Sequence, residues 1–240
     1  MRFKLSQITA AWRTWRLQAT EPVAAATLRS VRSEGLTYLD PAAILDLYQA
    51  ARAAERANLQ GAFVEAGTAR GGSALVLALA KTCMRPLLLF DAFERIPPPT
   101  AQDGPDAHAR YAAILAGASK GIGQQRYYGY EADLIGIVTG NFRRYGHDLA
   151  AEHIDLVKGY YEETLRLDQP VALAHLDCDW YDSVLVCLER ITPYLVPGGR
   201  LIVDDYQHWS GCRRAVDTFF AGRRQGFTFE QRSRLHIVRN

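Results

Sequence analysis

The chain has 240 residues, of which 48% are hydrophobic and 22% are charged, with a formal net charge of +2. This length suits one enzyme-sized domain, and the arginines do not form the long basic block that indicates nucleic-acid binding. The four cysteines lack zinc-type spacing. The sequence contains neither a signal peptide nor an apolar stretch of about 18 residues. We therefore expect a soluble, cytoplasmic protein without membrane or nucleic-acid partners.

Apolar strands and helices alternate along most of the chain. Helices are predicted at 41–58, 73–81 and 181–195. Short strands are predicted at 61–66, 86–91, 153–158, 171–177 and 201–205, and a terminal antiparallel hairpin at 227–230 and 235–238. Apolar strands that alternate with helices indicate a parallel sheet covered on both faces. The sequence thus predicts an α/β, doubly wound, Rossmann-like fold with a mostly parallel seven-stranded sheet.

Two segments fall outside this alternation. Residues 1–35, with Trp12, Trp15 and Leu17 among arginines, are predicted to form an N-terminal arm. The arm would pack on the core, on another subunit of a homo-oligomer, or over the site. Residues 96–123 follow a strand at the ligand-binding edge of the sheet, and such long connections are often lids. A disordered surface loop is the alternative for this segment. Residues 36–240 are predicted to form the main domain.

Carboxylates follow two neighbouring strands of the predicted sheet. Asp177 and Asp179 end the strand at 171–177, and Asp204 and Asp205 end the strand at 201–205. The carboxyl ends of parallel strands share one edge of an open α/β sheet, where ligands bind. Carboxylate oxygens are the ligands that Mg²⁺ prefers, so these side chains predict a magnesium site. The alternative is that the aspartates only cap the helices that follow.

A glycine-rich turn follows the first core strand. The residues that would shape it are Glu65, Gly67, Gly71, Gly72 and Ser73. Glycines let the backbone approach a ligand closely where a side chain would clash. The next strand ends in Asp91, where an acidic residue can accept both hydroxyls of a ribose. The glycine spacing differs from the dinucleotide fingerprint, so we expect another nucleotide-like cofactor, with a tight structural turn as the alternative.

Six segments in this order resemble the macrocin O-methyltransferase family. They are 64–67 with 70–72, 91–93, 159–165, 176–183, 197–199 with 203–206, and 211–216. The resemblance covers about residues 36–220. It implies a class I methyltransferase fold and the methylation of a small-molecule acceptor, at a hydroxyl of a sugar or sugar-like natural product. The implied cofactors are S-adenosylmethionine and Mg²⁺.

The resemblance also implies metal-binding and catalytic residues. The implied metal ligands are Asp177, Asp204 and Asp205, and the implied general base is Asp179. On an extended strand end, Asp177 and Asp179 would point the same way, which would place the base beside the metal. His175 and His208 are rival bases, of which His208 is the better placed because it follows the metal pair.

The donor-binding residues are implied in the same way. Glu65 and the glycine turn would hold the methionine part of the donor, and Asp91 would hold the ribose. Tyr160 would lie near the adenine. The family usually has a Thr-Met pair before the first core helix, whereas this chain has Tyr38 and Leu39 there.

The sequence alone leaves other activities open. A catechol- or phenol-type O-methyltransferase would use the same donor and metal but would line its acceptor site with flat apolar walls. Such walls could come from Trp180, Tyr181, Tyr206 and Trp209. A nicotinamide-dependent oxidoreductase is disfavoured because the glycine spacing is wrong and because it has no need of clustered carboxylates. A non-catalytic binding module is disfavoured by the intact acidic set.

Overall fold

A seven-stranded sheet forms the centre of the protein, whose structure, a computed structural model, describes residues 13–240. The strands are β1 (Ala62–Ala66), β2 (Leu87–Asp91), β3 (Ile154–Lys158), β4 (Val171–Leu176), β5 (Leu195–Val203), β6 (Phe227–Gln231) and β7 (Leu235–Arg239). Their order is β3-β2-β1-β4-β5-β7-β6. Strands β1 to β5 are parallel, and β7 is antiparallel to both neighbours. The predicted fold is confirmed.

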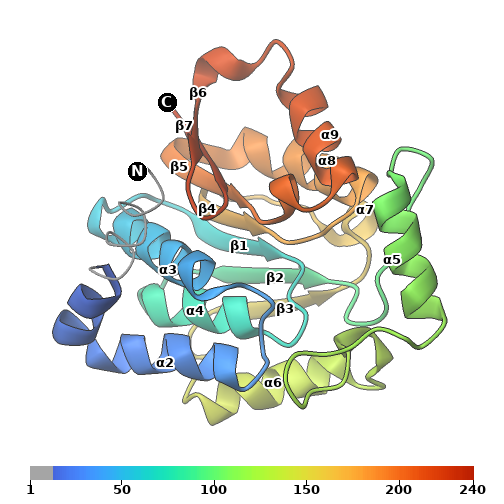
Figure 1. The fold of residues 1–240 in the computed structure, drawn as a ribbon. Helices are drawn as coiled ribbons and strands as arrows, with labels where there is room; N and C mark the ends of the chain where they lie inside the picture. Colours follow the sequence, from blue (N-terminus) through green and yellow to red (C-terminus); the bar gives the residue numbers. More distant parts are fainter. Residues whose placement is uncertain (1–12) are drawn as a thin grey trace, which may run out of the picture.

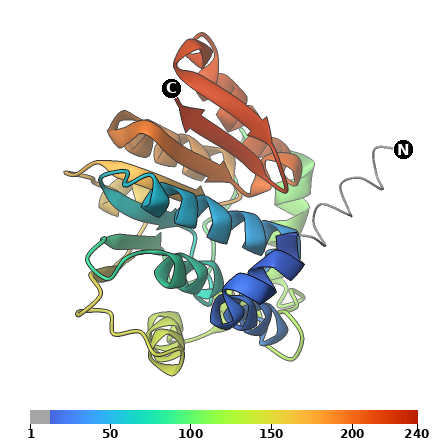
Figure 2. The ribbon, with the colours of Figure 1, turned by 90° about the vertical axis from the view of Figure 1, so that its left-hand side faces the viewer.

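Helices cover both faces of this sheet (Figure 1). On one side lie α2 (Pro22–Ser33), α3 (Pro41–Arg56), α4 (Gly72–Ala80) and α6 (Leu134–Arg144). On the other lie α7 (Tyr161–Thr164), α8 (Tyr181–Ile191) and α9 (Ser210–Phe220). Each layer buries its own apolar cluster against the strands, as expected of a parallel sheet. Figure 2 shows α3 in front of the strands and the β6–β7 hairpin at the upper edge of the sheet.

Strand β5 begins earlier than the sequence indicates. The prediction placed its start at 201, but the strand includes Pro197, Gly198 and Gly199. The register with β4 shifts between Val171 and Leu173, which pair with Leu195 and Arg200. A bulge of this kind inserts residues into a strand and bends it, so a Pro-Gly-Gly sequence that normally marks a turn lies inside β5.

The segment at 96–123 is built around a helix, α5 (Pro105–Leu115), and is not a plain loop. Figure 1 shows α5 beyond the arrowheads of the central strands. The segment contacts α8 and α9: the backbone N–H of Tyr181 donates to Asp103 Oδ1 (2.8 Å), and the backbone N–H of Ser210 donates to Asp106 Oδ2 (2.9 Å). Trp180 Nε1 donates to the carbonyl of Pro97 (2.9 Å). Its role as a lid stays a prediction.

The described part of the N-terminal arm packs on the chain's own core. Residues 13–20 are helical, and Leu17, Leu28 and Val31 are buried in the cluster that contains α3 and α4. Trp15 is exposed, whereas Trp12 lies outside the described residues. Within residues 13–240, no helix combines the length and the apolar character needed to cross a membrane.

Candidate active site

The strand-end aspartates lie together at the carboxyl edge of β4 and β5. Oxygens of Asp177, Asp179 and Asp205 all lie within 4.8 Å of one another. Ligand atoms of Asp204, Asp205 and His208 form a second group within the same limit. Two backbone bonds continue the ladder past the strand ends: Asp177 N donates to Ala66 O (2.8 Å), and Asp204 N donates to Leu176 O (2.9 Å). The predicted cluster is therefore present.

Asp179 reaches this cluster by a different route from the one expected. The sequence was read as an extended run through Asp177 and Asp179, but β4 ends at Leu176 and Asp179 has φ 58°. A non-glycine residue in this left-handed region is uncommon and costs free energy, so the chain turns sharply here. The turn, not strand alternation, brings the two carboxylates together. The extended-strand explanation was wrong.

The aspartates do not serve as helix caps for α8 or α9. The residues at the N-cap positions of these two helices are Trp180 and Trp209, and neither described helix has a side-chain cap hydrogen bond. The capping alternative is therefore contradicted for α8 and α9. Asp204 is the N-cap residue of the short 3-10 helix Asp205–Gln207, but it makes no side-chain cap hydrogen bond there. The carboxylates remain available to a ligand.

Burial and mutual repulsion make the carboxylate cluster electrostatically costly in the absence of a cation. Burial raises the pKa of Asp177 well above its usual value, and the charge of Asp204 adds to this effect. Burial and the charge of Asp179 do the same to the pKa of Asp205. Burial also raises the pKa of Asp179 to about 6. Like-charged buried groups favour protonation unless a cation compensates them.

The donor set fits a hard divalent cation. Several carboxylate oxygens converge, as Mg²⁺ requires. Among the described residues, Oδ2 of Asp205 is also a buried side-chain oxygen without a hydrogen-bond partner. A buried polar atom of this kind normally has a partner, so the unpartnered oxygen of Asp205 is consistent with a bound ion.

The two candidate histidine bases differ in access. His208 is exposed, and its Nδ1 lies 3.9 Å from Asp205 Oδ1. His175 is buried in β4, where its Nδ1 lies 2.9 Å from Glu65 Oε1. Burial lowers the pKa of His175, but the hydrogen bond and charge of Glu65 outweigh this effect and raise it. Only His208 lies on a cavity wall beside the carboxylates.

Glycines of the turn after β1 are required by close backbone packing. A Cβ on Gly67, which has φ 92°, would lie 1.9 Å from the carbonyl oxygen of Asp177. A Cβ on Gly72 would lie 2.6 Å from the carbonyl of Leu36. Gly71 has φ 85° at the N-cap of α4. The structural interpretation of this turn therefore accounts for all three glycines, and Gly67 also lines the cavities described below.

Hydrogen bonds to Asp91 hold this turn at the end of β2. Its Oδ2 accepts hydrogen bonds from the backbone N–H of Thr68 (2.6 Å) and Ala69 (3.1 Å), and its Oδ1 accepts one from Phe93 (2.7 Å). A carboxylate has about four acceptor positions, so capacity for a ligand hydroxyl remains. Burial raises the pKa of Asp91, which the three hydrogen bonds partly offset.

Two adjoining cavities open at this edge of the sheet. Both are lined by Gly67, Asp91, Tyr128, Asp177 and Asp179. The first, about 380 Å³, extends past Tyr160, and the second, about 280 Å³, extends past Asp204, Asp205 and His208. Together they match the size of small-molecule sites. The other predicted donor residues are buried and do not line these two cavities: Glu65, Gly71, Gly72 and Ser73.

Aromatic side chains line the second cavity, but Tyr181 and Tyr206, which were expected there, do not. Trp180 and Trp209 line it, with ring centroids 5.4 Å apart. Tyr181 and Tyr206 instead contact Arg214 and Arg213. Further wall residues include Tyr38, Tyr127, Tyr128, Arg110 and Arg234. No sequence pattern pointed to Arg110 and Arg234, because isolated arginines are common on surfaces. Residues 127–128 follow the predicted lid segment 96–123, in a stretch for which no element was predicted.

Comparisons with known proteins agree with this geometry. A profile of the Macrocin-O-methyltransferase (TylF) family matches residues 29–226. The chain is 32% identical over 168 residues to the 8-demethyl-8-(2,3-dimethoxy-alpha-L-rhamnosyl)-tetracenomycin-C 4'-O-methyltransferase of Streptomyces olivaceus, an alignment covering 68% of this chain and 59% of that protein. It is 28% identical over 170 residues to the demethyldecarbamoylnovobiocin O-methyltransferase of Streptomyces niveus, covering 68% and 60%.

The fold also has relatives among solved structures. The O-methyltransferase NovP superposes with a TM-score of 0.71 and 22% identity, over 98% of this chain and 99% of that one. At this identity the likeness concerns the fold. The chain spans only 59% and 60% of the length of the two curated relatives above.

Proposed function

Because the chain belongs to the macrocin O-methyltransferase family, we propose that it is a metal-dependent O-methyltransferase. It would move the methyl group of S-adenosylmethionine to a hydroxyl of a sugar or sugar-like small natural product. One observation carries this proposal: Asp177 and Asp179 line both cavities, so a donor in one cavity and an acceptor in the other would meet at the acid cluster.

The first cavity suits the donor. Asp91 has acceptor capacity left for a ribose hydroxyl, and Gly67 lets the ligand approach the backbone. Tyr160 is partly exposed on the same wall, where an aromatic ring can stack on adenine. Glu65 is buried and does not line this cavity, so we assign it to joining β1 to β4 through its hydrogen bond with His175.

We assign Mg²⁺ to Asp177, Asp204 and Asp205, with Asp179 beside them. Asp205 supports this assignment because it belongs to both groups of ligand atoms, one with Asp177 and Asp179 and one with Asp204 and His208. When bound, the cation lowers the pKa of an acceptor hydroxyl and fixes that hydroxyl in position.

Asp179 is proposed as the general base. Burial raises its pKa to about 6, so the group is mostly ionised near neutral pH and is basic enough to accept a proton. In the reaction, the acceptor oxygen forms a bond to the methyl carbon and the carbon–sulfur bond of the donor breaks. The hydroxyl proton goes to Asp179. His208 is the alternative base, because it is exposed on the same cavity wall.

A flat phenolic acceptor is the second candidate. The indole rings of Trp180 and Trp209 on the second cavity favour it, although such rings also stack on sugar faces. The names of the two relatives include a rhamnosyl-bearing tetracenomycin and a novobiocin precursor, which supports a natural-product acceptor.

A panel assay tests the acceptor class. The protein is incubated with S-adenosylmethionine, Mg²⁺ and matched glycosides and catechols, and mass spectrometry records methyl gain. Methylation of glycosides alone is expected. Methylation of catechols alone would reassign the acceptor, and no product with any acceptor, together with binding of NAD but not of S-adenosylhomocysteine, would contradict the proposed activity.

A further inference from the structure

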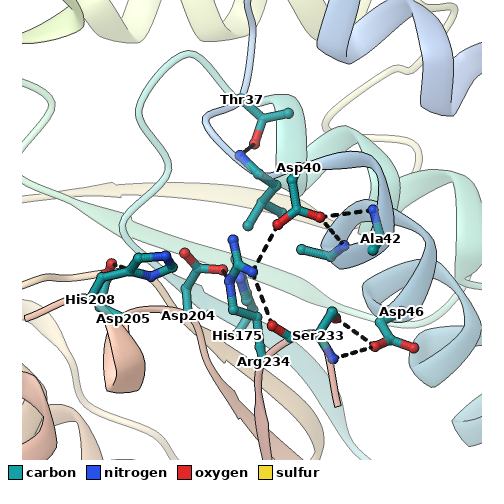
Figure 3. Close-up of polar contacts among 12 residues, drawn as sticks. Thr37, Asp40, Ala42, Asp46, His175, Asp204, Asp205, His208, Ser233 and Arg234 are labelled. Atoms are coloured by element: carbon teal, nitrogen blue, oxygen red, sulfur yellow. Dashed lines mark hydrogen bonds and ion pairs between the residues drawn. The ribbon is translucent and has the colours of Figure 1, made fainter. Parts of the chain in front are cut away.

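Arg234 joins the acid cluster to the start of α3 (Figure 3). Its Nε donates to Asp204 Oδ1 at 2.5 Å, and its Nη1 donates to Asp40 Oδ2 at 3.0 Å. The guanidinium is nearly buried, with 11% of the side chain exposed. Asp40 is the N-cap of α3, where it accepts hydrogen bonds from the backbone N–H groups of Ala42 and Ala43.

The sheet topology places Arg234 at this point. Val203 pairs with Leu235 in the antiparallel β5–β7 ladder, so one further step of the register sets Arg234 opposite Asp204. The turn that carries Arg234 is held on α3, because the N–H and hydroxyl of Ser233 both donate to Asp46 Oδ2. Figure 3 shows Ser233 between Arg234 and Asp46, with Asp40 on the upper side of Arg234. The arginine is therefore fixed from both the strand and the helix.

We propose that Arg234 is a positioning residue that holds Oδ1 of Asp204, so that the other carboxylate oxygen faces the proposed metal site. This role rests on the proposed function, since it concerns the same cation. A planar guanidinium presents its donors in fixed directions, so the bond from Nε holds Oδ1 of Asp204 in place. Asp40 accepts the hydrogen bond from Nη1 and prevents the guanidinium from rotating away from Asp204.

Charge and positioning make opposite predictions for metal affinity. Removing a positive charge beside a cation site should strengthen cation binding by Coulomb's law. Removing the group that orients a metal ligand should weaken cation binding, and such losses of metal affinity are typically about 10–100-fold. The sign of the change in affinity therefore separates the two roles.

The test measures Mn²⁺ affinity by titration calorimetry without donor or acceptor. Arg234→Gln should bind Mn²⁺ roughly 10–100-fold more weakly than wild type. Arg234→Lys should recover part of this loss, because an ammonium can contact Asp204 but cannot bridge both carboxylates as the guanidinium does. Asp40→Asn keeps a good helix cap but loses the ion pair, so a smaller weakening is expected.

Controls separate positioning from folding. Arg232→Gln removes a positive charge from the same turn, where Arg232 pairs with Glu230, and should leave Mn²⁺ affinity unchanged. Every variant should keep its affinity for S-adenosylhomocysteine, measured without metal. The electron paramagnetic resonance spectrum of bound Mn²⁺ should change in Arg234→Gln, because the coordination geometry changes.

The outcomes that overturn the proposal are distinct. Equal or tighter Mn²⁺ binding by folded Arg234→Gln would overturn the role of Arg234 alone, and unchanged binding by Asp40→Asn would overturn the part assigned to Asp40. A wild-type protein that binds S-adenosylhomocysteine but not Mn²⁺ would contradict the metal requirement of the proposed function, and this role with it.

Discussion

The indole Nε1 of Trp209 donates a hydrogen bond of 2.9 Å to Oδ1 of Asp179. Trp209 precedes α9, whereas Asp179 lies in the sharp turn after β4, so the bond connects the ends of two neighbouring strands through their following segments. A donor of this kind stabilises the ionised carboxylate and fixes its orientation. Asp179 is therefore held in place on the cavity wall by a side chain that the sequence suggested only as an aromatic surface.

Trp209→Phe should shift the pH dependence of the reaction. The hydrogen bond from Trp209 lowers the pKa of Asp179, so its loss should raise that pKa further. A bond to a charged group contributes about 1.5–3 kcal/mol, which corresponds to roughly one to two pH units. The acid limb of the pH–rate profile should move to higher pH by about this amount, with the alkaline limb unchanged.

Trp180→Phe is the matched control for this experiment. Trp180 also lines the cavity, but its Nε1 donates to Pro97 and not to a carboxylate. Its loss should leave the acid limb in place. Equal shifts in both variants would contradict the specific role of the Trp209–Asp179 bond.

Mg²⁺ should stabilise the protein more at neutral than at acidic pH. The pKa values of Asp177, Asp179 and Asp205 are raised in the folded state. Such groups contribute stability below their unfolded pKa of about 4 and lose it as pH rises through the folded value. We expect the metal-free protein to lose stability from these groups as the pH rises above about 4, and the cation to restore it.

Thermal unfolding with and without Mg²⁺ measures this effect. The rise in Tm should be larger near pH 7.5 than near pH 5, and Asp205→Asn should reduce it at both. A Tm shift that is independent of pH would show that these carboxylates do not bind the cation.

Asp91→Asn should weaken donor binding and loosen the glycine turn together. An amide has only one acceptor oxygen, so at least one of the N–H groups of Thr68, Ala69 and Phe93 loses its partner. The expected loss is about 1–3 kcal/mol in affinity for S-adenosylhomocysteine. Calorimetry measures it, with exposed Asp155→Asn on β3 as the control. Wild-type affinity in Asp91→Asn would mean that the donor lies elsewhere.

Gly67→Ala should damage both cavities, because its Cβ would meet the carbonyl of Asp177 at 1.9 Å. The ends of β1 and β4 would have to separate, so donor and metal affinities should fall together with Tm. Gly140→Ala is the control, since its Cβ has no neighbour within 4 Å among the described residues. Alanine inside α6 should be neutral or stabilising by up to ~1 kcal/mol. A fully stable Gly67→Ala protein would contradict this packing.

The sequence predicted the sheet well because buried parallel strands form apolar runs separated by helices. It misplaced the start of β5, since Pro197-Gly198-Gly199 is typical of a turn and the bulge depends on pairing with β4. It also missed α5, where prolines and glycines at each end make the segment resemble a loop. The start of β5 depends on contacts between distant segments, which local patterns do not contain.

The site was predicted in part for the same reason. The aspartates stand out because they follow strands directly, and the structure brings them together. Arg234 could not be found in this way, because its position opposite Asp204 depends on β7 lying next to β5. The left-handed turn at Asp179 likewise has no local sequence signal.

The most direct test of the central proposal is methyl transfer by metal-stripped protein. The protein is treated with a chelator, and transfer from S-adenosylmethionine to the preferred glycoside is followed by mass spectrometry before and after Mg²⁺ is added. We predict no transfer in chelator, recovery with Mg²⁺, and little recovery in Asp205→Asn, which loses a charged ligand oxygen. Transfer at the full rate in chelator would contradict the account.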